Sequence, residues 1–91
     1  MAQIIKADGT VEETEPANGI DFTLAEMKAV IGGGYIEIFN LSDGRLMVLD
    51  DEGKLKRFPR NPKATEMARD RLMPGDFICG DVLVCDNNQI D

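Results

Sequence analysis

The positively charged side chains of this chain are gathered in one short segment, and this is its clearest chemical feature. Seven of the ten lysine and arginine residues lie between Lys54 and Arg71, although the formal net charge is −7. Clustered cations create a local positive potential that attracts small anions. The segment therefore predicts an anion-binding surface on an otherwise acidic protein.

The best candidates for ligand contacts stand just before a predicted second helix. Arginine forks beside the unpaired amides of a helix N-terminus suit a phosphate or carboxylate group. We therefore predict four ligand-binding residues here: Arg57, Arg60, Asn61 and Lys63. The alternative interpretation is that the basic segment balances neighbouring carboxylates on a solvated face. Those carboxylates are Asp50, Asp51, Glu52, Glu66 and Asp70.

Two further candidates lie on a predicted strand over residues 35–41. Tyr35, Glu37 and Phe39 share one face of this strand, because side chains alternate between the faces. If that face forms a groove, Tyr35 supplies a stacking ring and Glu37 an acceptor for a base or sugar edge. Alternatively, Glu37 points to water.

No residue pattern indicates an enzyme. The sequence contains no histidine, which is the commonest general base in catalysis. Cys79 and Cys85 are expected to be buried, reduced thiols, and two soft ligands are too few for zinc. The acidic run 50–52 does not match the spacing of a calcium loop and predicts a solvated turn. We therefore predict no catalytic residues, no metal and no cofactor.

Three consecutive glycines, Gly32 to Gly34, follow a predicted helix and precede a strand. Phosphate loops have the opposite order, with the glycines before the helix. A helix C-terminal cap is therefore the better interpretation. Three glycines exceed what a cap requires, so a close approach by a ligand or another backbone segment stays open.

The elements that must position these residues form an α+β pattern. Strands are expected over 2–6, 10–15, 35–41, 45–50 and 76–86, and helices over 23–31 and 61–72. Asp-Gly pairs predict tight turns in two hairpins, and the polar second strand is expected at an edge of the sheet. The order β-β-α-β-β-α-β predicts a mainly antiparallel sheet of about five strands with two helices on one face.

The bulk composition limits the partners. The length predicts a single domain over residues 1–86 with a flexible C-terminal tail over 87–91. A pI of about 4.4 argues against broad nucleic-acid binding and against an anionic membrane surface. No long apolar run or signal-peptide pattern is present, so a cytoplasmic location is expected. A homo-oligomer that completes the small core is left open.

The stretch from Gly33 to Ala68 resembles a family of small proteins, known as a domain of unknown function, from bacteriophages, plasmids and other mobile elements. The likeness extends over most of 23–85. Its motifs are a Gly-Gly-Tyr-Ile-Glu strand (33–37), an Asp-Gly turn (43–44), Glu-Gly-Lys-Leu (52–55), Pro-x-Asn (59–61), Ala-Thr (64–65) and Ile-Cys-Gly (78–80).

The resemblance implies a setting but transfers no catalytic residue. Small acidic proteins of mobile elements often inhibit host defence by binding, which would place this chain in the cytoplasm of a bacterial host. We therefore expect a non-enzymatic counter-defence protein that sequesters an anionic, nucleotide-like small molecule. The alternative is an acidic inhibitor that binds a host protein directly.

Overall fold

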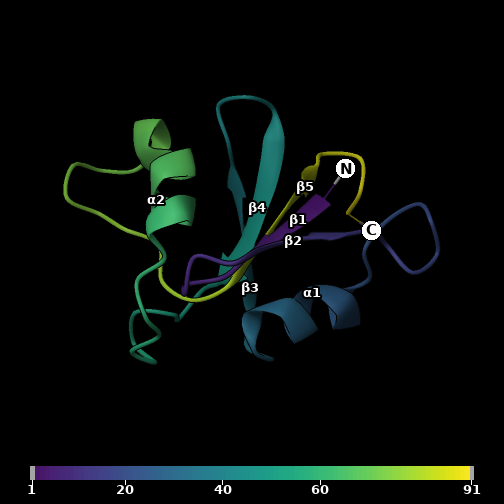
Figure 1. Ribbon diagram of the computed structural model, residues 1–91, viewed down its shortest axis with the longest axis horizontal. Helices are drawn as coiled ribbons and strands as arrows, with labels where there is room; N and C mark the ends of the chain where they lie inside the picture. The colour runs from purple at the N-terminus through teal and green to yellow at the C-terminus, as the bar shows by residue number, and fades with distance from the viewer. Residues whose placement is uncertain (1, 91) are drawn as a thin grey trace.

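The computed structural model describes residues 2–90. Its centre is a five-stranded sheet in the order β2-β1-β5-β4-β3, in which all neighbouring strands are antiparallel. Figure 1 shows the sheet between two helices. The elements are β1 (Ala2–Ile5), β2 (Val11–Thr14), α1 (Leu24–Ile31), β3 (Ile36–Asn40), β4 (Arg45–Asp50), α2 (Pro62–Ala68), a 3-10 turn (Arg69–Arg71) and β5 (Val82–Asp86). The predicted α+β class and element order are confirmed.

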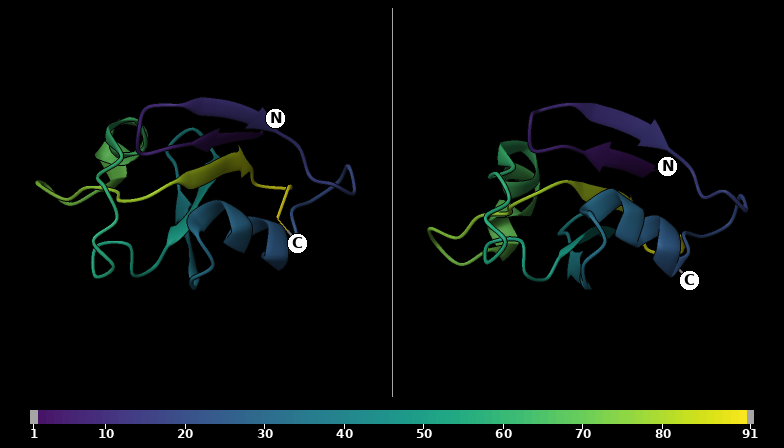
Figure 2. Two further views of the ribbon diagram at one scale, coloured as in Figure 1. Left: turned by 60° about the horizontal axis from the view of Figure 1, so that its bottom comes forward. Right: turned by 90° about the horizontal axis from the view of Figure 1, so that it is seen from below.

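Two outer hairpins flank the central strand β5. The first pairs β1 with β2 and the second pairs β4 with β3, so β2 and β3 form the two edges of the sheet. Figure 2 shows the first hairpin along one side of the molecule. In each turn, an aspartate side chain accepts a hydrogen bond from the backbone two residues later: Asp8 from Thr10 and Asp43 from Arg45. The polar strand β2 lies at an edge, as predicted.

Local sequence signals set the ends of both helices. Thr23 and Glu26 form a complete capping box at the start of α1, and Gly32 ends that helix in the left-handed conformation with φ 97°. Asn61 caps α2, with a proline at the next position. These caps satisfy backbone groups that a helix terminus otherwise leaves unpaired. The predicted helix starts are therefore confirmed, although α2 ends at Ala68 and a single 3-10 turn follows.

The structure differs from expectation in the placement of the helices, which pack on opposite faces of the sheet. Met27 of α1 belongs to one core cluster with Val48 of β4, whereas Ala64 of α2 belongs to the other cluster with Met47. Consecutive strand residues point to opposite faces, so the sheet separates two cores. The apolar runs of β4 and β5 lack alternation, which is typical of strands that are covered on both faces.

The segment before β5 is less regular than predicted. Only 82–86 forms a strand within the expected range 76–86, and Cys79 makes an isolated bridge with Arg60. Gly80 has a φ of 85° between the two parts, which is a conformation that glycine adopts readily. Cys79 and Cys85 are free and buried, and burial raises the pKa of Cys85 to about 11.

The division into a domain over 1–86 and a tail over 87–91 stays a prediction. Within the tail, Ile90 bridges Phe22 in parallel, and the Phe22 amide donates to the Gln89 carbonyl at 2.6 Å. Asp91 lies outside the described residues. Neither of the described helices has the length and apolar character needed to cross a membrane.

Candidate functional site

Asn61, which the sequence predicts as a ligand-binding residue, is fully buried and bonded within the protein. Its side-chain amide donates to the carbonyls of Ile5 and Gly80, both at 2.9 Å. Its side-chain oxygen accepts from the Ala64 amide at 3.1 Å. With an exposed fraction of 0%, Asn61 joins β1, α2 and the segment before β5. It has no surface left for a ligand, so this part of the prediction is corrected.

The basic side chains that surround Asn61 lie at the exposed surface. Arg57, Arg60 and Lys63 are all exposed, and the Arg60 guanidinium lies 3.8 Å from the centre of the Phe77 ring. Arg57 occupies a left-handed backbone conformation with φ 59°. None of these three residues lines either of the two main hollows found among residues 2–90. The structure does not bring them together around a shared cavity.

Several cations of the basic segment are paired with carboxylates. Lys56 pairs with Asp50 at 2.7 Å, Arg69 pairs with Glu66 at 2.9 Å, and Lys54 pairs with Asp76. The first two pairs match the alternative interpretation, in which the segment balances its acidic neighbours. Exposed ion pairs contribute little stability. The Asp50–Lys56 pair differs from the other two because the Asp50 carboxylate is buried.

Tyr35 and Glu37 lie near the second edge of the sheet but in different surroundings. Tyr35 is 73% exposed, and Lys28 lies 5.9 Å from the centre of its ring. Glu37 is exposed on β3 and lines the larger hollow together with Phe39. Among the predicted ligand residues, Glu37 is therefore the one that lines either of these two hollows.

This larger hollow is a groove with a volume of about 360 Å³. Strands β3 and β4 supply one wall, and the turn after β4 together with the segment between α2 and β5 supplies the others. Its lining combines apolar and acidic side chains with a single cation. These residues are Glu37, Phe39, Leu49, Asp50, Asp51, Glu52, Gly53, Lys54, Leu55, Leu72, Asp76, Phe77, Ile78 and Cys79. A second hollow of about 310 Å³ lies between α1 and the Phe58-Pro59 segment.

Asp50 is a groove-lining residue whose carboxylate is buried. It is 4% exposed and accepts hydrogen bonds from the Lys56 ammonium and the Glu52 amide, each at 2.7 Å. Burial alone would raise the pKa of Asp50, but these hydrogen bonds and the Lys56 charge outweigh it, so the pKa lies below its ordinary value of 3.8. Asp50 is therefore ionised and firmly held at neutral pH.

Gly34 makes room for this ion pair, which explains the third glycine after α1. A Cβ atom at position 34 would lie 2.3 Å from the Lys56 nitrogen and 2.5 Å from an Asp50 oxygen. Any side chain would therefore displace the pair. The sequence left open a close approach by a ligand or another backbone segment, whereas the structure places these two side chains against Gly34. Gly32 and Gly33 complete the helix cap through the Lys28 carbonyl.

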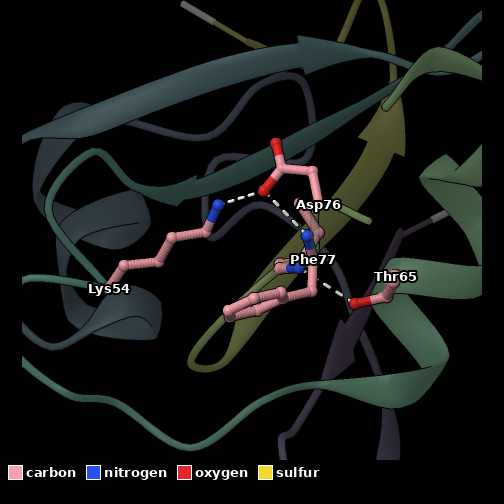
Figure 3. A network of polar contacts seen from close by, with 5 residues as sticks. Lys54, Thr65, Asp76 and Phe77 are labelled. Atoms are coloured by element: carbon pink, nitrogen blue, oxygen red, sulfur yellow. Dashed lines mark hydrogen bonds and ion pairs between the residues drawn. The ribbon is translucent and has the colours of Figure 1, made fainter. Parts of the chain in front are cut away.

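A polar network lies along the far side of the groove, and Figure 3 shows its contacts from close by. Lys54 reaches across to Asp76, whose carboxylate also accepts from the Phe77 amide at 2.8 Å. The hydrogen bond from Lys54, followed by that from Phe77, lowers the pKa of Asp76. The Lys54 ammonium also lies 4.7 Å from the centre of the Phe77 ring. Thr65 of α2 anchors the same segment by accepting from the Ile78 amide at 2.9 Å.

The groove keeps negative charge after these pairs are formed. Asp50 and Asp76 have lysine partners, whereas Glu37, Asp51 and Glu52 have no ion-pair partner within residues 2–90. Beside them, Leu55 is 80% exposed and Phe39 is half-buried. Among the described residues, no three acidic or thiol side chains gather closely enough to hold a metal ion. The arrangement suits a cationic side chain with an apolar neighbour.

Sequence reasoning missed most of this groove because three separate segments build it. The acidic turn 50–52 was visible in the sequence but predicts only a solvated turn. No local pattern in the sequence links Asp76 and Phe77 to β3. The one usable signal was the shared strand face of Glu37 and Phe39, which the structure places in the groove.

The fold and the groove define an α+β domain with an acidic, partly apolar hollow beside one edge of its sheet. The family described as a domain of unknown function (DUF3846) matches residues 3–91. The chain therefore belongs to this family, and the match covers nearly its whole length. Comparison with curated proteins and with solved structures gives no match in either set.

Proposed function

We propose that this chain is a non-enzymatic binding protein whose groove takes up a basic, partly apolar segment of a partner protein. This is the second of the two functions expected from the sequence. The observation that supports it is the chemistry of the groove, where Glu37, Asp51 and Glu52 have no ion-pair partner among the described residues and lie beside exposed apolar side chains.

The sequestration of a nucleotide-like anion has less support. Such a ligand needs cations around a cavity, but Arg57, Arg60 and Lys63 line neither hollow. The side chain of Asn61 forms its hydrogen bonds within the protein. Phosphate groups would meet repulsion from the unpaired carboxylates of the groove. The basic segment instead neutralises neighbouring acids and supports the loop that borders the groove.

A counter-defence role fits this binding mode. Proteins that bind nucleic acids carry exposed basic segments, and an acidic groove that captures such a segment would block it. Under this proposal, the partner is a basic host protein, and the setting is a phage or mobile element in a bacterial cytoplasm. Electrostatic complementarity would supply fast association and selectivity, while the apolar wall would slow dissociation.

Calorimetric titration with a defined peptide tests this proposal. The probe is an acetylated and amidated octapeptide of alternating lysine and valine, with a glutamate–valine peptide as the control ligand. The matched protein variants are Glu37→Lys in the groove and Glu13→Lys on β2, because both replace an exposed glutamate on an edge strand. We expect Glu37→Lys to weaken binding by at least ~10-fold, about 1.4 kcal/mol, and Glu13→Lys to change it by less than about twofold.

Three results would contradict the proposal. These are absence of binding at millimolar peptide, equal loss of binding in the two variants, and a preference for the glutamate–valine peptide. A rise in melting temperature with a nucleotide that disappears in Arg60→Glu would restore the anion hypothesis instead.

A further inference from the structure

The backbone of β3 offers an unused row of hydrogen-bonding groups. Antiparallel strands alternate between residue pairs that are hydrogen-bonded to each other and pairs that are not. At the two ends of the hairpin, the Tyr35 carbonyl accepts from Asp51 at 3.0 Å and the Leu41 amide donates to Arg45 at 2.9 Å. The odd-numbered residues of β3 therefore face β4, and those numbered 36, 38 and 40 direct their N–H and C=O groups to the free edge.

This edge lacks the protection that the opposite edge carries. Strand β2 presents Glu12 and Glu13, with Glu15 directly after it, and these like charges discourage pairing with a second copy of this acidic chain. Strand β3 reads Ile-Glu-Ile-Phe-Asn, without proline or lysine. Its central Ile38 is 42% exposed, and Tyr35 just before the strand is 73% exposed.

The edge and the groove share a strand. Glu37 and Phe39 line the groove, while Ile36 belongs to the opposite face, where it packs against the cluster that contains α1. A chain paired with β3 would direct every second side chain to the groove face at a spacing of about 6.8 Å. The other side chains would meet Ile38 on the α1 face.

Resting on the proposed function, we propose that the partner segment binds as an extended strand that pairs antiparallel with β3 and becomes the sixth strand of the sheet. Its basic side chains, opposite Glu37 and Phe39, lie over the groove and meet the carboxylates of Glu37, Asp51 and Glu52. Its apolar side chains lie opposite residues 36, 38 and 40. Main-chain hydrogen bonds supply affinity, and the alternating side chains supply selectivity.

Charge complementarity selects a basic partner segment over a second copy of this chain. Two copies paired through β3 would bring two sets of unpaired groove carboxylates together, in addition to a formal net charge of −7 on each chain. A basic segment instead neutralises the same carboxylates. Like charges brought together across an interface are unfavourable.

The proposal makes a residue-specific prediction about the bound peptide. In the antiparallel pairing, the peptide residues opposite 36, 38 and 40 are the apolar ones, and their N–H groups point at β3. The N–H groups of the basic residues point to water. N-methylation of the valine residues should therefore abolish binding of the lysine–valine octapeptide, whereas N-methylation of its lysine residues should leave the affinity within about threefold.

Calorimetry with the parent peptide and its two methylated forms, on the unaltered protein, carries out this test. Loss of binding only on valine methylation supports strand addition. Equal affinities of the three peptides, with Glu37→Lys still weakening binding, would leave the groove proposal standing and overturn strand addition. Loss only on lysine methylation, or a concentration-dependent dimer that excludes the peptide, would also overturn strand addition. No binding of any form at millimolar concentration would overturn both proposals.

Discussion

The two outer hairpins of this protein use the same turn chemistry but build different edges. Each turns at an Asp-Gly pair, and each inner strand pairs with β5. The outer strand β2 is rich in glutamate, whereas the outer strand β3 is mainly apolar and lies against a groove. Local turn signals therefore fix both hairpins, whereas the composition of the outer strand decides which kind of chain its edge repels.

The largest expected effect concerns the asparagine that anchors the first hairpin to α2. Asn61→Ala removes the partners of the buried Ile5 and Gly80 carbonyls and of the Ala64 amide. Unsatisfied buried groups are costly, so we expect a loss of about 3 kcal/mol in the free energy of unfolding. Asn40→Ala at the exposed end of β3 is the control, with an expected change below about 0.5 kcal/mol. Urea denaturation measures both values, and similar losses would show that Asn61 is not the anchor described.

The next largest loss of stability is expected at Gly34, before β3, and it can be compared with the loss at Gly9, before β2. Gly34→Ala forces a Cβ atom into the Asp50–Lys56 pair, and we expect a loss of about 2 kcal/mol because the carboxylate is buried and its partner is half-exposed. Gly9 lies in the Asp-Gly turn before β2 with φ 96° and no atom within 4 Å of an added Cβ. Gly9→Ala should cost only the backbone strain, about 1 kcal/mol. Thermal unfolding of both variants compares them, and a smaller loss for Gly34→Ala would contradict the role given to the pair.

Acid should weaken the second hairpin through Asp50. Its pKa in the folded protein lies below the ordinary value of 3.8, so its ionised form stabilises the fold. That contribution is fully present above about pH 5 and is lost as the pH falls through the folded pKa. The stability difference between the natural protein and Asp50→Asn should therefore shrink between about pH 5 and pH 2. Denaturation across this range measures it, and a constant difference would argue against the ion pair.

Proline substitutions in the two edge strands should have the smallest effect on stability, but they should differ most in peptide binding. Ile38 and Glu13 are central residues of their edge strands, and both direct their N–H groups away from the sheet. The Lys6 amide donates to the Thr10 carbonyl at 2.8 Å, which sets this alternation in β2. Proline is tolerated at such positions, so Ile38→Pro and Glu13→Pro should each cost less than about 1 kcal/mol.

Binding should separate these two proline variants completely. Only Ile38→Pro removes an N–H group from the edge beside the groove, so it alone should lose the lysine–valine peptide in calorimetry. Equal binding by both variants would show that the peptide does not use β3.

Much of the fold could be predicted from the sequence because its signals are local. The capping box of Thr23 and Glu26, the Asn61 cap and the Asp-Gly turns all act within four residues. The placement of the helices on opposite faces depends on contacts between distant elements. In the sequence, only the unbroken apolar runs of β4 and β5 indicated that both faces of the sheet are covered.

The candidate site was less predictable, because basic residues that are close in the sequence do not lie around one cavity in the structure. Lys54 and Lys56 turn to Asp76 and Asp50, and Arg60 lies over Phe77. Asn61 fulfilled its predicted role as a helix cap, and that role excludes the ligand role. The structure places Glu37 at a groove, where its neighbours could be known only from the structure, and its ligand role stays a prediction.

Hydrogen–deuterium exchange of individual amides, measured with and without the lysine–valine octapeptide, reports directly on whether the peptide pairs with β3. We expect the peptide to slow exchange at Ile36, Ile38 and Asn40 and to leave exchange at Val11 and Glu13 unchanged. Slowing at Val11 and Glu13, or no slowing at β3 under saturating peptide, would contradict it.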